Sequence, residues 1–367
     1  MKILYDHQIF ASQMYGGISR YFYELTNAFD AMHNVKTNIS LVVSNNHYIS
    51  DKKYVQYIDF LPNKHFRGKQ RLFNLFNKPN SILKLKQQNF DVFHPTYYDP
   101  YFLNYIGSKP FVLTVYDMIH EKFNDMFLEN DTTSKNKRLL CKKASKIIAI
   151  SQSTKKDLTE LFGIDEAKIE VVYLGNSMVL GDVIVSDMEV PKKYILFVGS
   201  RGGYKNFDRF VRSAASLLND NADLSVVCVG GGKFNSNELN LFKKLNVESK
   251  LFQFNLDDNL LAQFYAKALM FLFPSLYEGF GIPILEAFAC QCPLVCSNTS
   301  SLPEIAGDGA EYFDPYSEES IYNAIKTVLV DDVKKELLVK NGTERLKYFS
   351  WEETAKQTKN FYESVIK

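Results

Sequence analysis

Cysteine is scarce in this chain of 367 residues, and its spacing suits neither disulfides nor metal binding. The five cysteines are an odd number, and none stands in a C-x-x-C pair: Cys141, Cys228, Cys290, Cys292 and Cys296. Disulfide frameworks and structural zinc sites both need paired or clustered cysteines. We therefore expect reduced thiols in the core of a cytosolic protein.

An excess of one charge is also absent. The chain has 43 Lys and Arg residues against 42 Asp and Glu, which leaves a net charge of +1 and argues against a general nucleic-acid-binding protein. No run reaches the roughly 18 apolar residues that a membrane-spanning helix needs. The opening MKILYDHQIF is too short an apolar stretch for a secretory signal. Together these absences favour a cytoplasmic, globular protein.

What the sequence does contain is a regular alternation of short apolar runs with longer helical patterns. The strands that we expect are 2–5, 39–43, 92–94, 111–115, 147–151, 194–198, 224–229, 251–254, 270–273 and 294–297. Continuous apolar runs are typical of parallel strands that are buried on both faces. Strand-helix alternation predicts an α/β protein with doubly wound sheets.

The alternation runs through two cycles, and turn-forming residues separate them. Glycines and a proline interrupt the pattern between Leu174 and Pro191, after which the strand YILFVG begins the second cycle. We therefore expect two Rossmann-like domains, at residues 1–178 and 190–350.

The segment from Phe273 to Glu286 has the strongest functional pattern. A buried strand ends near Pro274, a loop with two glycines follows, and Pro283 occupies a first-turn position that opens a helix. Ligands of open α/β sheets lie at this end of a strand, and a helix N-terminus attracts an anion such as a diphosphate. Glu278 and Glu286 bracket the loop, and carboxylates accept hydrogen bonds from sugar hydroxyls. A carboxylate in a first helical turn can also be a simple capping residue.

The motif EGFGIPILEA resembles the E-x7-E motif of the retaining glycosyltransferases of family 4, which have the GT-B fold. Other segments match that family in the same order: YGGISRYFYEL, DVFHPTYY, FVLTVYDMIHE, IIAISQSTKKDL, YILFVGSRGGYKNF and SSLPEIAGDGAEYFDP. The resemblance implies two domains that face a central cleft. It also implies an acceptor side in the N-terminal domain, a donor side in the C-terminal domain, and a C-terminal helix, 351–367, that returns to the N-terminal domain beside Trp351.

The resemblance also implies roles for individual residues. Glu278 would contact the transferred sugar and Glu286 the nucleotide ribose, while Arg201 and Lys205 would neutralise the diphosphate. The other donor-side positions that it implies are Gly16, Gly17, Gly279, Phe280, Gly281 and Ile282. In the N-terminal domain the family commonly has His-Asp, whereas this chain has Tyr116-Asp117 with His120 slightly later. Either Asp117 or His120 would take the polar role near the reaction centre. His94 is equally explained as a satisfied histidine at a strand end.

The resemblance implies a hexosyltransferase that uses a GDP- or UDP-sugar. Its acceptor would be a glycan or a lipid-linked sugar, in bacterial surface polysaccharide or O-antigen synthesis. The sequence has no Asp-x-Asp, His-Glu-x-x-His or Cys/His cluster, so we expect no metal and no cofactor. A nucleotide-sugar epimerase is an alternative, but it needs further acid-base carboxylates. An NAD-dependent dehydrogenase is disfavoured because Asn235 stands where the third glycine of G-x-G-x-x-G belongs.

The segment 64–86 lies outside these motifs and combines basic with large apolar residues. If it is helical, Leu72, Phe73 and Phe76 share a face, and several Lys and Arg residues surround them. Such a stretch is typical of a membrane-surface element, here at the inner face of the membrane beside a lipid-linked acceptor. An ordinary helix whose phenylalanines face the core explains it equally well.

Overall fold

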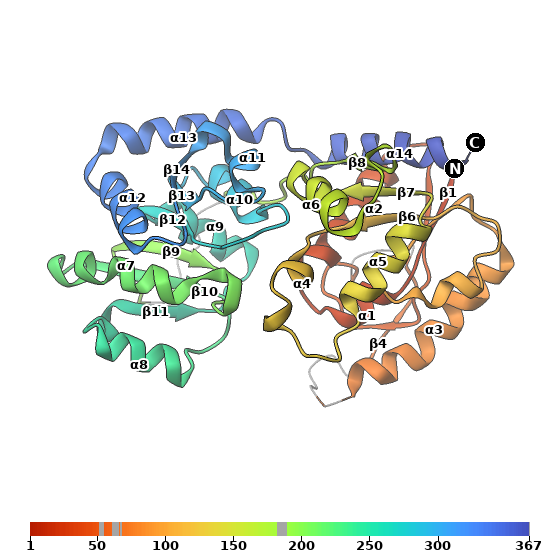
Figure 1. The fold of residues 1–367 in the computed structure, drawn as a ribbon, viewed down its shortest axis with the longest axis horizontal. Helices are drawn as coiled ribbons and strands as arrows, with labels where there is room; N and C mark the ends of the chain where they lie inside the picture. The colour runs from red at the N-terminus through yellow and green to blue at the C-terminus, as the bar shows by residue number, and fades with distance from the viewer. Residues whose placement is uncertain (51–54, 61–65, 67, 182–188, 367) are drawn as a thin grey trace. The chain divides into compact units, whose positions relative to one another are not determined.

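The computed structural model describes residues 1–50, 55–60, 66, 68–181 and 189–366, and it divides the chain into two compact units (Figure 1). The first unit comprises Met1–Gly175 and Ser350–Lys367, and the second comprises Asn176–Phe349. The division at Gly175 falls at the start of the interruption that the turn-forming residues predict.

Parallel strands form the sheets of the first unit. Three of them pair in the order β2-β1-β5 and three more in the order β6-β7-β8. Their bounds are β1 (Lys2–Tyr5), β2 (Lys36–Ile39), β5 (Val92–His94), β6 (Val112–Val115), β7 (Lys146–Ala149) and β8 (Ile169–Val171). A parallel bridge between Phe93 and Phe111 connects the two sets. The strand expected at 39–43 is instead the end of β2 and the start of a two-residue strand, β3 (Val43–Ser44), which pairs with β4 (Ile58–Asp59).

Helices connect these strands and take their apolar faces from the sequence pattern. They are α1 (Gln8–Ser12), α2 (Gly17–Asp30), α3 (Lys69–Gln87), α4 (Ile119–Lys122), α5 (Thr133–Lys143) and α6 (Gln152–Phe162). In α2 the residues Phe22, Leu25 and Phe29 recur at helical spacing, and all three are buried. The stripe therefore faces the core of the unit.

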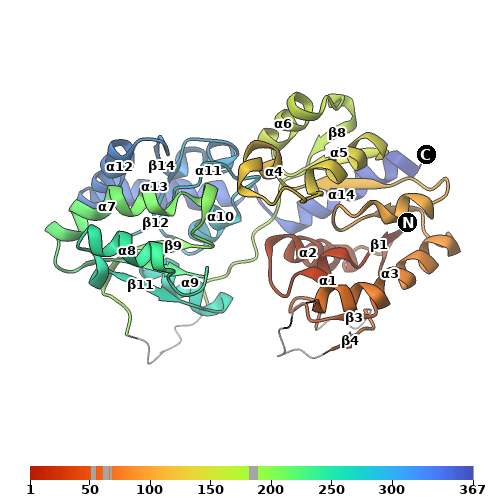
Figure 2. The same ribbon diagram turned by 60° about the horizontal axis from the view of Figure 1, so that its bottom comes forward.

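The C-terminal helix, α14 (Trp351–Ile366), belongs to the first unit and packs on α2 (Figures 1 and 2). It also contacts β5. Its buried Tyr362 hydroxyl shares hydrogen bonds with Tyr5 Oη at 3.1 Å and with His94 Nδ1 at 2.5 Å. His94 Nε2 bonds Thr114 Oγ1 at 2.9 Å. His94 is thus a satisfied histidine at a strand end, and burial lowers its pKa to about 3.

Six parallel strands form one sheet in the second unit, in the order β11-β10-β9-β12-β13-β14. Their bounds are β9 (Lys193–Val198), β10 (Leu224–Val229), β11 (Leu251–Phe254), β12 (Met270–Phe273), β13 (Leu294–Ser297) and β14 (Ala310–Phe313). All residues of β10, β12 and β13 are buried, as expected of strands with helices on both faces. The α/β fold class with doubly wound parallel sheets is confirmed.

The helices of the second unit cover this sheet. They are α7 (Phe207–Asp220), α8 (Ser236–Lys244), α9 (Asp258–Lys267), α10 (Ile282–Ala289), α11 (Leu302–Ala306), α12 (Glu318–Val330) and α13 (Asp332–Leu346). One core cluster joins alternate residues of the strands to α7, α8 and α12. The opposite residues of the strands, such as Leu196 and Phe271, are also fully buried. The carboxyl ends of the strands are therefore held in fixed positions.

All five cysteines are free and buried, which confirms core thiols, and burial raises the pKa of Cys141 to about 12. Within the described ranges, no helix is both long enough and apolar enough to cross a membrane.

Candidate active site

The topology of the second unit places one strand junction where ligands of open sheets bind. From β9 the chain runs outward to β10 and β11, and it then returns to β12 on the other side of β9. The carboxyl ends of β9 and β12 therefore flank a switch in strand order, the position at which such sheets form a crevice. The loop after β9 carries Lys205, and the loop after β12 carries Glu278.

Lys205 and Glu278 meet at this switch point although 72 residues separate them in the sequence. Lys205 Nζ donates to Glu278 Oε1 at 2.6 Å, and the two side chains are 18% and 11% exposed. Asn206 ties the two loops together, because its Nδ2 donates to Pro274 O at 3.1 Å. A partly buried Lys–Glu pair at a strand junction presents one cationic and one anionic group to a ligand.

Hydroxyl side chains after β13 hold the Glu278 loop in place. Ser300 Oγ accepts from Glu278 N at 2.9 Å, and Ser301 Oγ donates to the carbonyl oxygens of Glu278 and Phe280 at 2.9 and 3.0 Å. Gly281, with φ of 101°, is the N-cap of α10. A side chain there would be strained and would press on Leu302. The loop is thus preorganised before any ligand arrives.

Glu286 lies in α10 and is almost completely buried. Its Oε2 accepts from the Tyr265 hydroxyl at 3.1 Å, and 8% of Glu286 is exposed. Burial, together with the charge of Glu286, keeps the pKa of Tyr265 well above its usual value. Tyr265 therefore remains a hydrogen-bond donor and orients the carboxylate. Sequence reasoning missed Tyr265, because nothing in the helix around it marks that tyrosine as a partner of Glu286.

Two family models match consecutive parts of the chain. Residues 15–176 match Glycosyltransferase Family 4, and residues 185–345 match Glycosyl transferases group 1. The chain belongs to the family 4 glycosyltransferases. Three similar proteins illustrate how far this relation extends.

O-antigen chain mannosyltransferase B of Escherichia coli is 46% identical over 105 residues, which are 29% of this chain and 28% of that protein. A Campylobacter jejuni protein is 31% identical over 215 residues, 58% of each chain. It is named N-acetylgalactosamine-N,N'-diacetylbacillosaminyl-diphospho-undecaprenol 4-alpha-N-acetylgalactosaminyltransferase. These matches span less than two thirds of either relative. Anabaena HepE, solved with UDP and glucose, superimposes with a TM-score of 0.74 at 16% identity and covers 99% of this chain and 100% of HepE, which gives the GT-B fold.

Arg201 of this family 4 glycosyltransferase has a different environment from Lys205. Its side chain is 3% exposed, and its Nε donates to Glu238 Oε1 at 2.8 Å. Nη1 donates to Gly230 O at 2.9 Å, and Nη2 donates to Gly232 O at 2.9 Å and to Lys233 O at 3.1 Å. Most of the N–H donors of the Arg201 guanidinium therefore bind carbonyl groups of the loop after β10. In this arrangement Arg201 holds that loop, and the arrangement gives no support to the predicted contact with a diphosphate.

Gly16 and Gly17 lie at the start of α2 in the first unit, where Gly16 is the N-cap. Gln13 folds over this helix end, and its Oε1 accepts from Ser19 N at 3.2 Å. A side chain on Gly16 would collide with Gln13. Because these are the end atoms of a flexible side chain, Gln13 could shift, and a donor-phosphate role for Gly16 and Gly17 stays a prediction.

Asp117 and His120 follow the carboxyl end of β6. Asp117 Oδ1 accepts from Ile119 N at 3.0 Å and lies 4.0 Å from Lys137 Nζ. The His120 ring stacks on Phe127 with the ring centres 3.9 Å apart. Burial, with the nearby charge of Lys137, lowers the pKa of His120, so the imidazole is neutral near pH 7. Their catalytic roles stay predictions.

Among the described residues, no group of three or more His, Cys, Asp or Glu side chains is arranged to hold a metal ion. The prediction that the enzyme works without a metal is untested by this and needs a direct experiment.

Proposed function

We propose that this protein is a retaining hexosyltransferase. It moves a hexosyl group from a GDP- or UDP-sugar to a glycan or lipid-linked sugar acceptor during synthesis of a bacterial surface polysaccharide. The second unit binds the donor, and the first unit binds the acceptor.

One observation carries the proposal: Lys205 and Glu278 form a 2.6 Å pair at the switch point of a doubly wound sheet, and Glu286 lies about one turn into the helix that follows. The ammonium group of Lys205 attracts the diphosphate of a ligand, and the carboxylate of Glu278 accepts hydrogen bonds from the hydroxyls of a hexose. The Tyr265 hydroxyl keeps the Glu286 carboxylate oriented, which suits a ribose with two adjacent hydroxyls. These are the parts of a nucleotide-sugar.

Lys205 acts mainly in the transition state. As the bond between the sugar C1 and the phosphate oxygen breaks, negative charge gathers on the diphosphate, and a nearby ammonium group stabilises that charge. The positive end of the α10 helix dipole also stabilises that charge. This division of work requires no metal ion, and we propose that the reaction proceeds without one.

Retention follows when the acceptor hydroxyl approaches C1 from the face that the diphosphate leaves. The bond from C1 to the phosphate oxygen breaks, a bond from C1 to the acceptor oxygen forms, and the acceptor proton passes to the departing diphosphate. Atoms and charge balance without a covalent enzyme intermediate.

The relatives support the class of donor and acceptor. Two of them carry names that specify a mannosyl and an N-acetylgalactosaminyl transfer, the second to a diphospho-undecaprenol-linked saccharide. HepE was solved with UDP and glucose. We therefore propose hexoses or N-acetylhexosamines as the transferred group.

The reaction can be tested with purified protein, a panel of GDP- and UDP-sugars and a lipid-linked saccharide extract, in the presence of EDTA. The proposal predicts transfer from one donor, with the anomeric configuration of the donor preserved in the product by NMR. Inversion would contradict the retaining mechanism, and strict dependence on added divalent metal would contradict metal independence. Conversion of a donor in the absence of acceptor would favour the epimerase alternative.

We further propose that α3 contacts a membrane surface. Phe73 faces the core and is 3% exposed, but Leu75, Phe76 and Leu83 are 65%, 49% and 54% exposed. Lys69, Arg71, Lys84 and Lys86 lie on the same helix. Lys64 and Arg67, which belong to the predicted basic stretch, lie outside the described residues. Exposed apolar side chains beside basic ones are the pattern of a helix that binds an anionic lipid surface.

A further inference from the structure

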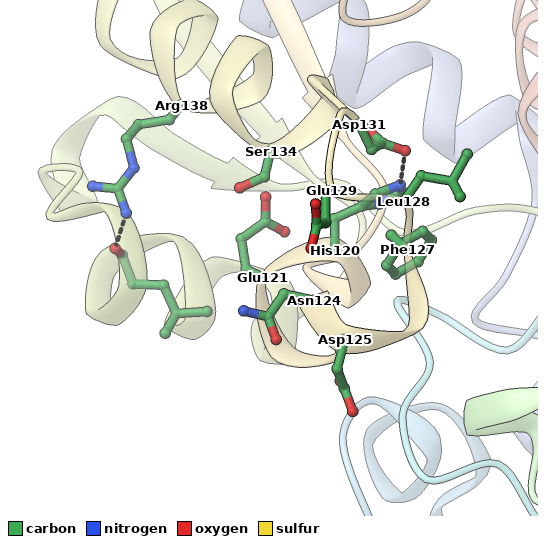
Figure 3. Close-up of a pocket in the computed structure, with 11 residues that line it drawn as sticks. His120, Glu121, Asn124, Asp125, Phe127, Leu128, Glu129, Asp131, Ser134 and Arg138 are labelled. Atoms are coloured by element: carbon green, nitrogen blue, oxygen red, sulfur yellow. Dashed lines mark hydrogen bonds and ion pairs between the residues drawn. The ribbon is translucent and has the colours of Figure 1, made fainter.

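A cavity of about 730 Å³ opens beside the carboxyl end of β6 in the first unit. Its lining comes from α4, the turn η2 (Asn124–Met126), the segment 127–131, α5 and Leu161 of α6. Figure 3 shows Glu121, Asn124 and Ser134 around its centre and His120 with Phe127 along one side. Its volume lies within the range of small-molecule sites, about 300–1,000 Å³.

Glu121 contributes a buried carboxylate oxygen to this cavity. Its other oxygen, Oε2, accepts from Lys137 Nζ at 2.8 Å. Lys137 is itself 1% exposed, and it also donates to Asp117 O at 2.9 Å. The Glu121 side chain is 6% exposed, yet its Oε1 has no hydrogen-bond partner within the part of the chain that the structure describes. A buried acceptor without a donor is costly, and native structures rarely leave one unmatched.

His120 contributes a second unmatched atom to the same cavity. Its Nδ1 is buried and has no partner among the described residues, while its Nε2 lies 3.7 Å from Asp131 Oδ2. The ring stacks on Phe127. Glu121, His120 and Phe127 all line the cavity, so a carboxylate, an imidazole and an aromatic ring lie on adjoining segments around it.

The charges of the residues that line the cavity favour a neutral ligand over an anion. The two basic groups nearest the cavity have partners: Lys137 binds Glu121, and Arg138 Nη2 donates to Leu161 O at 2.9 Å. Beyond the Glu121–Lys137 pair, the lining has three further acidic groups, Asp125, Glu129 and Asp131, against one basic residue, Arg138. An anion such as a phosphate is repelled by such a surface, whereas a neutral polyol offers hydroxyl donors to it. A pyranose also has an apolar C–H face that fits an aromatic ring.

From this geometry we propose that the cavity is the subsite for a pyranose unit of the acceptor. The Glu121 carboxylate, held by Lys137, accepts from a sugar hydroxyl, and Phe127 supports the apolar face of the ring. This inference rests on the proposed transferase function and names the part of the chain that recognises its acceptor.

Two variants and a matched control test the subsite. Glu121→Gln keeps the shape of the side chain but removes its charge, and Phe127→Ala removes the ring without touching the Lys137 pair. Glu160→Gln changes an exposed carboxylate on α6 in the same unit and serves as the control. Each protein is first checked by thermal melting. Phe127→Ala keeps the test decisive if Glu121→Gln unfolds.

The readouts are the KM for a lipid-linked saccharide acceptor, the KM for the donor, and saturation-transfer NMR with methyl pyranosides of mannose, glucose, galactose and N-acetylhexosamines. We expect both variants to raise the acceptor KM about 10-fold or more and to weaken the pyranoside signal, with the donor KM within twofold of wild type. The control should match wild type throughout.

Folded Glu121→Gln or Phe127→Ala protein with an unchanged acceptor KM and unchanged pyranoside binding would overturn the inference and leave the transferase function standing. Pyranoside binding that depends on Glu121 and Phe127 in a protein that transfers no sugar would have the opposite meaning. In that case the subsite would stand and the proposed function would fail.

Discussion

At the scale of single residues, Lys205 is expected to matter more for turnover than for binding. Its ammonium group faces Glu278 in the free protein and would face the diphosphate as charge develops there. Lys205→Gln should therefore lower kcat by about 10²- to 10³-fold while weakening nucleotide affinity much less. Steady-state kinetics and calorimetric titration measure the two effects separately.

Lys340→Gln, on the exposed side of α13, is the matched control for Lys205 and should behave as wild type. If Lys205→Gln keeps its kcat and loses only nucleotide affinity, the side chain binds the ground state and the transition state equally, which would contradict the role proposed for it.

Substitution of Arg201 is expected to lower stability, whereas substitution of Lys205 is expected to lower turnover, although the two residues lie four positions apart. Breaking a buried ion pair by removing one partner costs about 3–5 kcal/mol, and Arg201 also ties the Gly230–Lys233 loop. Arg201→Gln should therefore lower the free energy of unfolding by several kcal/mol in urea titrations, and Glu238→Gln should do so to a similar degree. A variant of full stability that has lost nucleotide binding would instead favour direct contact with the diphosphate.

At the scale of elements, His94 links α14 to the sheet of the first unit and makes its stability depend on pH. Burial lowers the pKa of His94 to about 3, whereas an unfolded histidine has a pKa of about 6.5. The unfolded state therefore binds more protons between these values, and stability is complete above pH 6.5 and is lost as the pH falls.

Urea unfolding at pH 6.5 and pH 5 measures this dependence in wild type and in His94→Gln. Between these two pH values wild type should lose about 1.7 kcal/mol more than the variant, because the full slope of about 1.4 kcal/mol per pH unit is reached only below the unfolded pKa. His7 and His120, whose pKa values are also lowered by burial, remain in both proteins and cancel in the difference. Equal slopes would mean that His94 is protonated in the folded state or is not buried there.

The contact of α3 with lipid is also a property of an element. Co-sedimentation with anionic vesicles should decrease as salt rises, and it should decrease further in a Lys69→Gln, Arg71→Gln double variant, because each basic residue near an anionic leaflet adds about 1 kcal/mol. Phe76→Ser, at an exposed apolar position, should also weaken binding, and Lys340→Gln should not. An absence of vesicle binding at low salt would leave α3 as an ordinary surface helix.

At the scale of the whole molecule, the alternation of apolar runs and helical patterns was enough to predict the α/β fold, because parallel strands buried on both faces have a clear sequence pattern. The same pattern located the loops of Lys205 and Glu278 at strand ends, and the sheet order then brings these residues together.

Features that depend on contacts between distant segments were harder to predict. Arg201 is a basic residue in a glycine-rich loop, and the sequence does not reveal that carbonyl groups some 30 residues later take its donors. The roles of Tyr265 and Lys137 likewise depend on hydrogen-bond partners on other elements, Glu286 and Glu121. Helical spacing alone places Phe73 and Phe76 of α3 on one face, but in the structure Phe73 is buried and Phe76 is exposed.

The proposed function requires that the second unit bind a nucleoside diphosphate through Glu286 and its neighbours without a metal. Calorimetric titration of wild type with UDP, GDP and ADP in EDTA, beside Glu286→Ala and the control Glu319→Ala, tests this most directly. Glu319 is an exposed carboxylate in the first turn of α12. We expect saturable binding of one of the three nucleotides, weakened about 10-fold or more in Glu286→Ala and unchanged in Glu319→Ala. Binding of none of them at millimolar concentration, or equal binding by wild type and Glu286→Ala, would contradict it.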